Sequence, residues 1–308
     1  MSLPIAEDRA VAGAENTRPR LRTISAVINP AAGSVRPGAE DQLRALIAEL
    51  GYSLSLFTVG ADNVDELVRK AVGADPDLLV VLAGDGTARL AAELCGPDGP
   101  LLAPLPGGTL NMLPHALYGT SPWREALRSA LTDGIERPVS GGRVCGHSFY
   151  VAAILGAPAL WGQAREALRS GKLIEAKRRM DLAFRRAFAG GLRYGAEHQP
   201  ERKTEALVLI CPLVSKALEQ ECALELAALD FHDARELMRL AFSGVIGDWR
   251  RDPAVSIEQV QHGWASMRGS IPSILDGETH KLPHRAEFEF TPRAFRALAP
   301  PNLAVPSL

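Results

Sequence analysis

The chain has 308 residues, which corresponds to about two domains at roughly 150 residues each. It contains 34 Lys and Arg residues against 36 Asp and Glu residues, so its net charge is −2. This balance excludes a general polyanion binder, and any affinity for nucleic acid or membrane must come from a local patch. Hydrophobic residues make up 46% of the chain and charged residues 23%, the mix of a soluble globular protein with a sizeable core.

The four cysteines lie far apart in the sequence, at Cys95, Cys145, Cys211 and Cys222, and form no C-x-x-C pair. This spacing argues against a zinc cluster or a disulfide framework and fits a reducing cytoplasm. Residues 1–20 lack the apolar core of a signal peptide, so we expect a disordered leader there.

Strand-like and helix-like patterns alternate between residues 23 and 133, which predicts βαβ units and a mostly parallel sheet. The unbroken apolar run Leu78–Ala83 is typical of a strand that is covered on both faces. Asp62 is expected to start the second helix. The expected strands are Thr23–Ile28, Ser53–Val59, Leu78–Ala83 and Leu101–Leu105, and the expected helices cover Leu43–Leu50, Val64–Ala71 and Ala88–Cys95.

The pattern changes after Asp133, where short strand-like runs dominate and predict a β-rich second domain. We therefore expect an α/β domain at residues 21–135 and a second domain at residues 136–308, whose last residues can return to the first. The second domain is expected to hold a hairpin of Val139–Val144 and Ser148–Leu155, helices at Ala159–Ala189 and Ala234–Phe242, and strands at Ala206–Cys211, Ala223–Leu229, Val255–Val260, Ser273–Leu275 and Ala286–Phe290.

The most informative local pattern is a buried strand that runs into Gly84-Asp85-Gly86-Thr87 and then into a helix. Glycines allow the backbone to approach a ligand closely, and a helix start offers unpaired N–H groups to a phosphate. Asp85 can orient a phosphate-bound Mg²⁺, and Thr87 can donate its hydroxyl. The alternative is a plain tight turn between strand and helix.

Two further glycine-bearing loops, Asn29–Ser34 and Pro104–Asn111, leave neighbouring strands at the same edge of the expected sheet. Loops at the carboxyl ends of neighbouring parallel strands line a single crevice. The three loops together therefore predict one ligand site.

These motifs resemble the diacylglycerol kinase catalytic domain family, which includes sphingosine kinases and bacterial lipid kinases. Asn29-Pro30 with Gly33 resembles the first nucleotide motif, and Gly84–Thr87 resembles the GGDGT signature. Pro106–Asn111 resembles the P-x-G-T-x-N loop, and Asp276-Gly277-Glu278 the late DGE motif. The nucleotide-binding residues that the resemblance implies are Asn29, Pro30, Gly33, Thr58, Gly84, Asp85, Gly86, Thr87, Gly107, Gly108, Thr109 and Asn111.

The resemblance implies an α/β nucleotide-binding domain and a sandwich-like domain with the active site in the cleft between them. It also implies ATP with Mg²⁺ and phosphorylation of a lipid hydroxyl. Asp85 is the expected metal ligand, and the late motif supplies the acidic catalytic residue. We favour Glu278 as the base, with Asp276 fixing the turn or assisting, although a D-G-E surface turn without chemistry is the simplest local reading.

Three departures from the family pattern keep other functions open. Ala83 replaces the first glycine of GGDGT, Arg89-Leu90 replaces the following Asn-Glu, and Met112 replaces an Asp. The alternatives are a kinase of a soluble acceptor, such as a nucleotide or a polyol, and a non-catalytic nucleotide- or lipid-binding regulator. The turn also resembles that of NAD kinases, but the chain lacks a convincing Asn-Asn-Glu element after the second loop.

The segment Arg165–Arg193 contains nine basic residues against three acidic ones, and its apolar residues can share one helical face. A basic amphipathic helix suits an anionic membrane surface, where a lipid substrate is found. The expected partner is therefore a lipid at the inner membrane face and not a nucleic acid. The alternative is a solvated helix that packs on its own domain.

Overall fold

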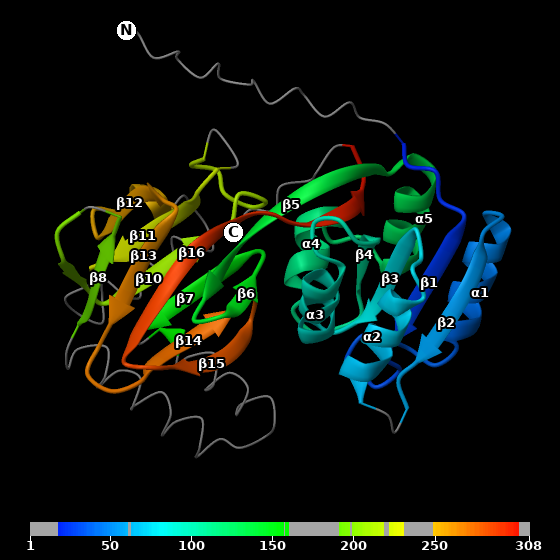
Figure 1. Ribbon diagram of the computed structural model, residues 1–308, viewed down its shortest axis with the longest axis horizontal. Helices are drawn as coiled ribbons and strands as arrows, with labels where there is room; N and C mark the ends of the chain where they lie inside the picture. Colours follow the sequence, from blue (N-terminus) through cyan, green and yellow to red (C-terminus); the bar gives the residue numbers. More distant parts are fainter. Residues whose placement is uncertain are drawn as a thin grey trace, which may run out of the picture.

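The computed structural model places the chain in two lobes that lie side by side (Figure 1). It describes residues 18–60, 63–156, 158–159, 191–197, 199–218, 222–230 and 249–301. Most of the basic segment Arg165–Arg193, the helix expected at Ala234–Phe242 and residues 1–17 lie outside the described residues.

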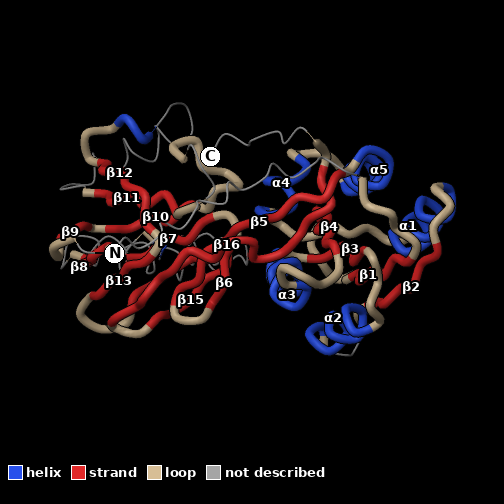
Figure 2. The backbone as a smooth tube through the Cα atoms, turned by 45° about the horizontal axis from the view of Figure 1, so that its top comes forward, coloured by secondary structure: helices blue, strands red, loops and turns tan. Residues whose placement is uncertain are grey.

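The first lobe is a parallel sheet with the strand order β2-β1-β3-β4. Helices α1 and α5 cover one face of this sheet, and α2 and α3 cover the other (Figure 2). All six residues of β3 are buried, as its unbroken apolar run predicts. The elements are β1 (Thr23–Ile28), α1 (Ala39–Glu49), β2 (Ser53–Thr58), α2 (Val64–Gly73), β3 (Leu78–Ala83), α3 (Asp85–Cys95), β4 (Leu101–Pro106), α4 (Met112–Tyr118) and α5 (Trp123–Asp133).

Three helix starts differ from the sequence prediction. Helix α1 begins at Ala39 and not at Leu43. Helix α3 begins at Asp85 and not at Ala88, because Gly84 already has the extended conformation of an N-cap residue. The GDGT sequence is therefore the first turn of a helix and not a turn that precedes one. Helix α2 is capped by Asn63 and not by Asp62, since the Asn63 side chain accepts a hydrogen bond from the N–H of Asp65.

Two long antiparallel strands, β5 (Ile135–Val144) and β16 (Arg285–Ala299), run from one lobe into the other (Figure 1). At its end β16 pairs in parallel with β4, through Ala297 and Leu102. The sequence predicts only residues 286–290 of β16. The later half escapes the alternation rule because a register shift between Thr291 and Phe295 interrupts it, and Arg293 in this bulge has φ +47°.

The second lobe is a sandwich. The sheet of the first lobe continues into the second lobe, from β4 through β16, β13 and β8 to β9, and has ten strands in total. A six-stranded antiparallel sheet, β12-β11-β10-β7-β14-β15, packs on this second-lobe part around one apolar core that includes Phe149, Phe288 and Leu209. The remaining elements are β6 (His147–Phe149), β7 (Ala152–Gly156), β8 (Leu192–Ala196), β9 (Arg202–Thr204), β10 (Ala206–Ile210), β11 (Leu224–Leu229), the 3₁₀ turn η1 (Trp249–Arg251), β12 (Val255–Val260), β13 (His262–Ser266), β14 (Ile271–Leu275) and β15 (Glu278–Leu282).

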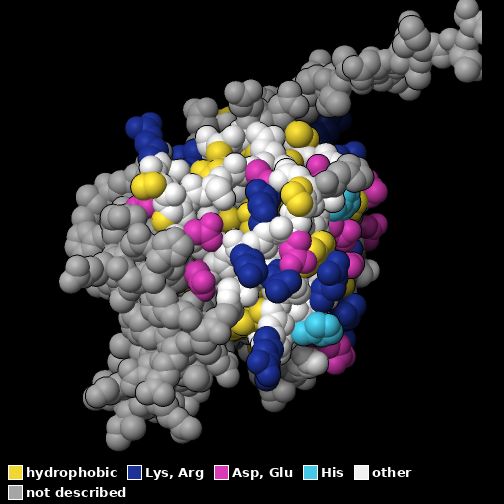
Figure 3. All heavy atoms as spheres, turned by 90° about the vertical axis from the view of Figure 1, so that its left-hand side faces the viewer, with side chains coloured by type: hydrophobic (Ala, Val, Ile, Leu, Met, Phe, Trp, Pro, Cys, Tyr) yellow, Lys and Arg dark blue, Asp and Glu magenta, His cyan; other side chains and the backbone are white. Residues whose placement is uncertain are grey.

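The predicted fold class, an α/β lobe followed by a β-rich sandwich-like lobe, is confirmed by these sheets. The predicted hairpin is corrected in part: β5 pairs with β6, but β7 belongs to the other sheet. On the described part of the end of the second lobe, acidic and basic side chains lie intermixed (Figure 3). None of the helices in the described part of the chain is long and apolar enough to span a bilayer.

Candidate active site

A cavity of about 640 Å³ lies between the two lobes. On one side it is lined by the loops that follow β1, β3 and β4, and on the other by β7, β14 and the turn between β14 and β15. The structure thus brings together the carboxyl ends of three parallel strands and a turn that lies far downstream in the sequence. The predicted site residues that line the cavity are Asn29, Gly33, Gly84, Asp85, Gly86, Thr87, Gly108, Thr109, Asp276 and Glu278.

Four predicted nucleotide-binding residues do not line this cavity. Pro30 lines a neighbouring cavity of about 370 Å³. Thr58 ends β2, the outermost strand, where it pairs with Ile28. Gly107 and Asn111 belong to the third loop but do not line the cavity: the carbonyl of Gly107 accepts the N–H of Ser34, and the Asn111 side chain accepts the N–H of Gly108.

The three loops are joined directly to one another. The N–H of Ser34 donates to the carbonyl of Gly107 over 2.9 Å, and the hydroxyl of Ser34 donates to the carbonyl of Gly108 over 2.5 Å. A Cβ atom on Gly108 would lie 2.8 Å from the Cα of Gly84, closer than real Cβ contacts come. Glycine is therefore required at position 108 because two backbones meet there.

Asp85 and Asn111 hold the GDGT turn against the third loop. The carboxylate of Asp85 accepts the N–H groups of Asn111 over 2.9 Å and of Met112 over 2.7 Å, at the start of α4. The side chain of Asn111, whose φ is +53°, accepts the N–H of Gly108 over 2.7 Å. Burial raises the pKa of Asp85, and these two N–H groups oppose the shift. Asp85 therefore has a structural task besides the predicted catalytic one.

The cavity suits a phosphate-bearing ligand with its own cation. The first N–H groups of α3 have no partner inside the helix and lie at the positive end of its dipole. Among the described residues, no group of three or more His, Cys, Asp or Glu side chains could hold a metal alone. Mg²⁺ commonly binds through one or two carboxylates together with substrate phosphates, and each oxygen of Asp85 keeps a free lone pair. Asp85 therefore fits as a single protein ligand to Mg²⁺.

Asp276 is buried and serves as an anchor for the loop between β6 and β7. Its carboxylate accepts the N–H groups of Tyr150 over 2.7 Å, Val151 over 2.9 Å and Ala152 over 3.0 Å. Burial raises the pKa of Asp276 to about 6, and the three N–H groups counteract part of that shift. Of the two roles that the sequence leaves open for Asp276, this geometry supports the structural one, in which its carboxylate ties the Asp276–Glu278 turn to the loop between β6 and β7.

Glu278 is the carboxylate that remains available to a ligand. Its side chain is 40% exposed, lines the cavity and lies directly over Gly86 in the first turn of α3. One of its oxygens, Oε2, forms an ion pair of 2.9 Å with Nη2 of Arg89, a residue that the motif comparison marks only as a departure. Nη1 of Arg89 lies 3.2 Å from Nε2 of His280.

The wall next to Glu278 is apolar. Ile154 of β7 and Ile274 of β14 pair across the sheet, and both line the cavity together with Leu110 and Met112. The sequence gives no signal for this wall, because the two isoleucines lie on separate strands whose pairing is long-range. A ligand that carries both a hydroxyl and an apolar portion would match it.

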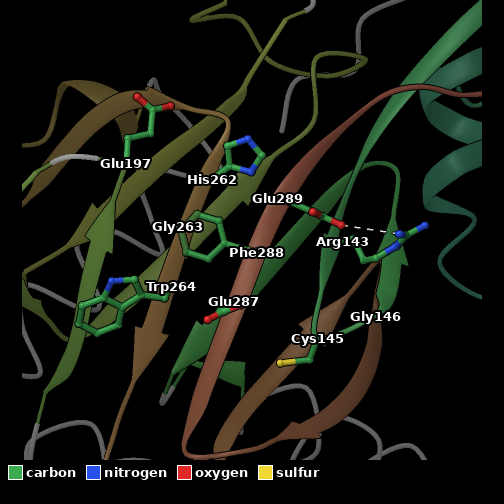
Figure 4. A pocket seen from close by; sticks show the side chains of 10 residues that line it. All are labelled: Arg143, Cys145, Gly146, Glu197, His262, Gly263, Trp264, Glu287, Phe288 and Glu289. Carbon is green, nitrogen blue, oxygen red and sulfur yellow. Dashed lines mark ion pairs between the residues drawn. The ribbon is translucent and has the colours of Figure 1, made fainter.

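A second cavity, of about 420 Å³, lies on the β-rich lobe (Figure 4). Its residues come from the faces of strands, from the turn after β5 and from Glu197, just after β8 (Leu192–Ala196). Glu289 pairs with Arg143 at 3.6 Å, and the guanidinium of Arg285 covers the ring of Trp264 at 4.1 Å. These pairs are those of a solvated sheet face, so we assign the chemistry to the first cavity.

Comparison with known proteins confirms the resemblance that the motifs indicate. Residues 23–144 match the model of the diacylglycerol kinase catalytic domain family, so this part of the chain is similar to that catalytic domain. A match to this family indicates a kinase. A comparison with curated protein sequences found no match.

Solved structures from Bacillus anthracis strain Sterne share the fold. One, described as a diacylglycerol kinase, has a TM-score of 0.66 at 15% identity, over 92% of this chain and 99% of its own. Two others, described as candidate diacylglycerol kinases, have TM-scores of 0.69 at 15% and 16% identity with the same coverage. At this identity the likeness establishes the two-lobed architecture.

Proposed function

We propose that this protein is an ATP-dependent lipid kinase that transfers the γ-phosphoryl group to the hydroxyl of a diacylglycerol- or sphingoid-like lipid. The observation that carries the proposal is the composition of one cavity, in which the three glycine-bearing loops after β1, β3 and β4 (the phosphate-type loops) face the partly exposed carboxylate of Glu278 and an apolar wall. The family match at residues 23–144 supports the kinase class.

In the proposed reaction the loops and the first turn of α3 bind the phosphates through their N–H groups. The carboxylate of Glu278 takes the proton of the lipid hydroxyl while that oxygen forms a bond to the γ-phosphorus. The bond between the γ-phosphorus and the bridging oxygen breaks, and ADP leaves. Mg²⁺, held by Asp85 and the nucleotide, would supply neutralisation of the phosphate charge.

We also propose that the acceptor is met at a membrane surface and that the basic segment Arg165–Arg193 contributes to this encounter. The nine basic residues of the segment support the idea, because anionic headgroups attract such clusters. Most of this segment lies outside the described residues, so the proposal rests on its sequence.

The test is transfer of radiolabelled phosphate from [γ-³²P]ATP by the purified full-length chain. Diacylglycerol and sphingosine in anionic mixed micelles are compared with glycerol and nucleosides as soluble acceptors. Label in the lipid fraction supports the proposal, and label only in a soluble acceptor assigns the soluble-acceptor alternative. Nucleotide binding without transfer to any acceptor would favour the non-catalytic regulator that the departures at Ala83, Arg89 and Met112 leave open.

The contact between Gly86 and Glu278 leads to a prediction that separates folding from activity. A methyl group on Gly86 would overlap the carboxylate of Glu278, which is the end of a flexible side chain and can move away. Gly86→Ala is therefore expected to leave the melting temperature unchanged or slightly raised, since alanine favours a helix by about 1 kcal/mol over glycine. Turnover should nevertheless fall, because the carboxylate is displaced from the cavity.

Calorimetry and the transfer assay on the same Gly86→Ala preparation check this prediction. Gly73→Ala at the end of α2 is the matched control, since no atom lies within 4 Å of the Cβ position there. Wild-type turnover in Gly86→Ala would show that the position of Glu278 is unimportant.

A further inference from the structure

We propose that Arg89 is the positioning residue for Glu278: its guanidinium holds Oε2, which leaves Oε1 over the first turn of α3. This inference rests on the proposed function, because it concerns Glu278 as the proton acceptor.

The ion pair bridges the two lobes at the cavity. Arg89 lies on α3, the helix whose first turn is the GDGT sequence, whereas Glu278 begins β15 of the second lobe. Because Arg89 and Gly86 are close neighbours on one rigid helix, the 2.9 Å contact fixes the carboxylate relative to the phosphate-type turn. Without it, only the short β14–β15 turn would determine where Glu278 points.

Arg89 acts from behind the carboxylate and not from within the cavity. Its side chain is 20% exposed and is not among the residues that line the cavity, whereas Glu278 is. Oε1 of Glu278 is the oxygen nearest to Gly86, and Oε2 is the one that Arg89 holds. The guanidinium is thus placed to orient the carboxylate while leaving one oxygen to the ligand.

His280 holds the other side of the guanidinium. Nη1 of Arg89 lies 3.2 Å from Nε2 of His280, and a guanidinium only donates, so Nε2 must be an acceptor and the imidazole neutral. Burial, Arg89 and His147 lower the pKa of His280, whereas Glu278 opposes the shift. The ring of His147 on β6 lies 5.0 Å from that of His280. Arg89 is therefore held by two side chains of β15, and these two contacts fix the orientation of its planar guanidinium.

The experiment compares Arg89→Met, Arg89→Lys and Glu278→Gln, alone and combined, in the γ-phosphoryl transfer assay. Arg89→Met should lower kcat by about 10²-fold, the cost of a misplaced catalytic group, with KM for ATP unchanged. Arg89→Lys should recover part of the lost kcat, because lysine keeps the positive charge but lacks the planar guanidinium that can donate to two acceptors at once. In the Glu278→Gln background, Arg89→Met should cause no further loss, since the group it positions is already gone.

The control is Arg128→Met. Arg128 forms an ion pair of the same kind, 2.9 Å from Glu49, between α5 and α1, on the other side of the first lobe from α3. It should leave kcat and KM unchanged. Unchanged kcat in Arg89→Met would overturn the proposal. A further loss in the Glu278→Gln background, with weaker ATP binding, would also overturn it and show that Arg89 contacts the phosphates itself.

A second readout does not depend on activity. In Arg89→Met the pKa of His280, followed by NMR of the labelled imidazole, should rise because one of the groups that lowers it is removed. If wild type transfers no phosphate but this pKa rises, the contacts of Arg89 stand and the proposed function fails. If wild type is active and the pKa of His280 does not move, the assigned geometry is wrong.

Discussion

Replacing Glu278 by Gln is expected to lower kcat for phosphoryl transfer by about 10²–10⁴-fold, the usual contribution of a general base. The amide has nearly the same shape as the carboxylate but cannot take a proton from the acceptor hydroxyl. Nucleotide binding should persist, because the loops proposed to bind the nucleotide belong to the first lobe, whereas Glu278 belongs to the second. Single-turnover transfer and equilibrium binding of a fluorescent ATP analogue measure the two effects separately.

Glu289→Gln provides a matched control on the same lobe. Glu289 is about half exposed and pairs with Arg143 in the second cavity, away from the phosphate-type loops. It should retain wild-type turnover. If Glu278→Gln also retains it, the DGE sequence is only a surface turn and the proton acceptor must be sought elsewhere.

Replacing Asp276 by Ala is expected to destabilise the fold by about 3 kcal/mol or more, because three buried N–H groups lose their acceptor. Asp276→Asn should cost less. The carbonyl oxygen of the asparagine can still accept the N–H groups of Val151 and Ala152. Only the N–H of Tyr150 then faces the side-chain NH2, which cannot accept a hydrogen bond. Urea denaturation monitored by circular dichroism measures both changes.

The stability result distinguishes Asp276 from Glu278. Because Glu278 is partly exposed and its carboxylate meets no backbone donor among the hydrogen bonds of the described residues, Glu278→Gln should leave the denaturation midpoint nearly unchanged. A stable Asp276→Asn variant with no turnover would instead assign Asp276 a direct part in the chemistry.

The sequence predicts well those features that depend on nearby residues. The alternation of strands and helices and the glycine-bearing ends of β1, β3 and β4 are local, and a parallel sheet then places these ends at one edge. The location of the GDGT turn follows for the same reason. Its exact form does not, since a glycine followed by an aspartate can precede a helix or begin one.

Features that depend on distant contacts could not be predicted. Asp276 meets Val151 across 125 residues of chain, and Arg89 meets His280 across 191. No periodicity links such residues, so the sequence shows Arg89 only as an unusual residue and leaves the role of Asp276 open. The later half of β16 shows no strand signal in the sequence, because its bulge breaks the alternation on which strand prediction depends.

The most direct test of the single-cavity account is a crystal structure of the full-length chain with Mg²⁺ and a non-hydrolysable ATP analogue. We expect the phosphates to lie against the first turn of α3 and the loops at Gly33 and Gly108, with the γ-phosphate facing Glu278. A nucleotide bound at any other place, or phosphates that face away from Glu278, would contradict it.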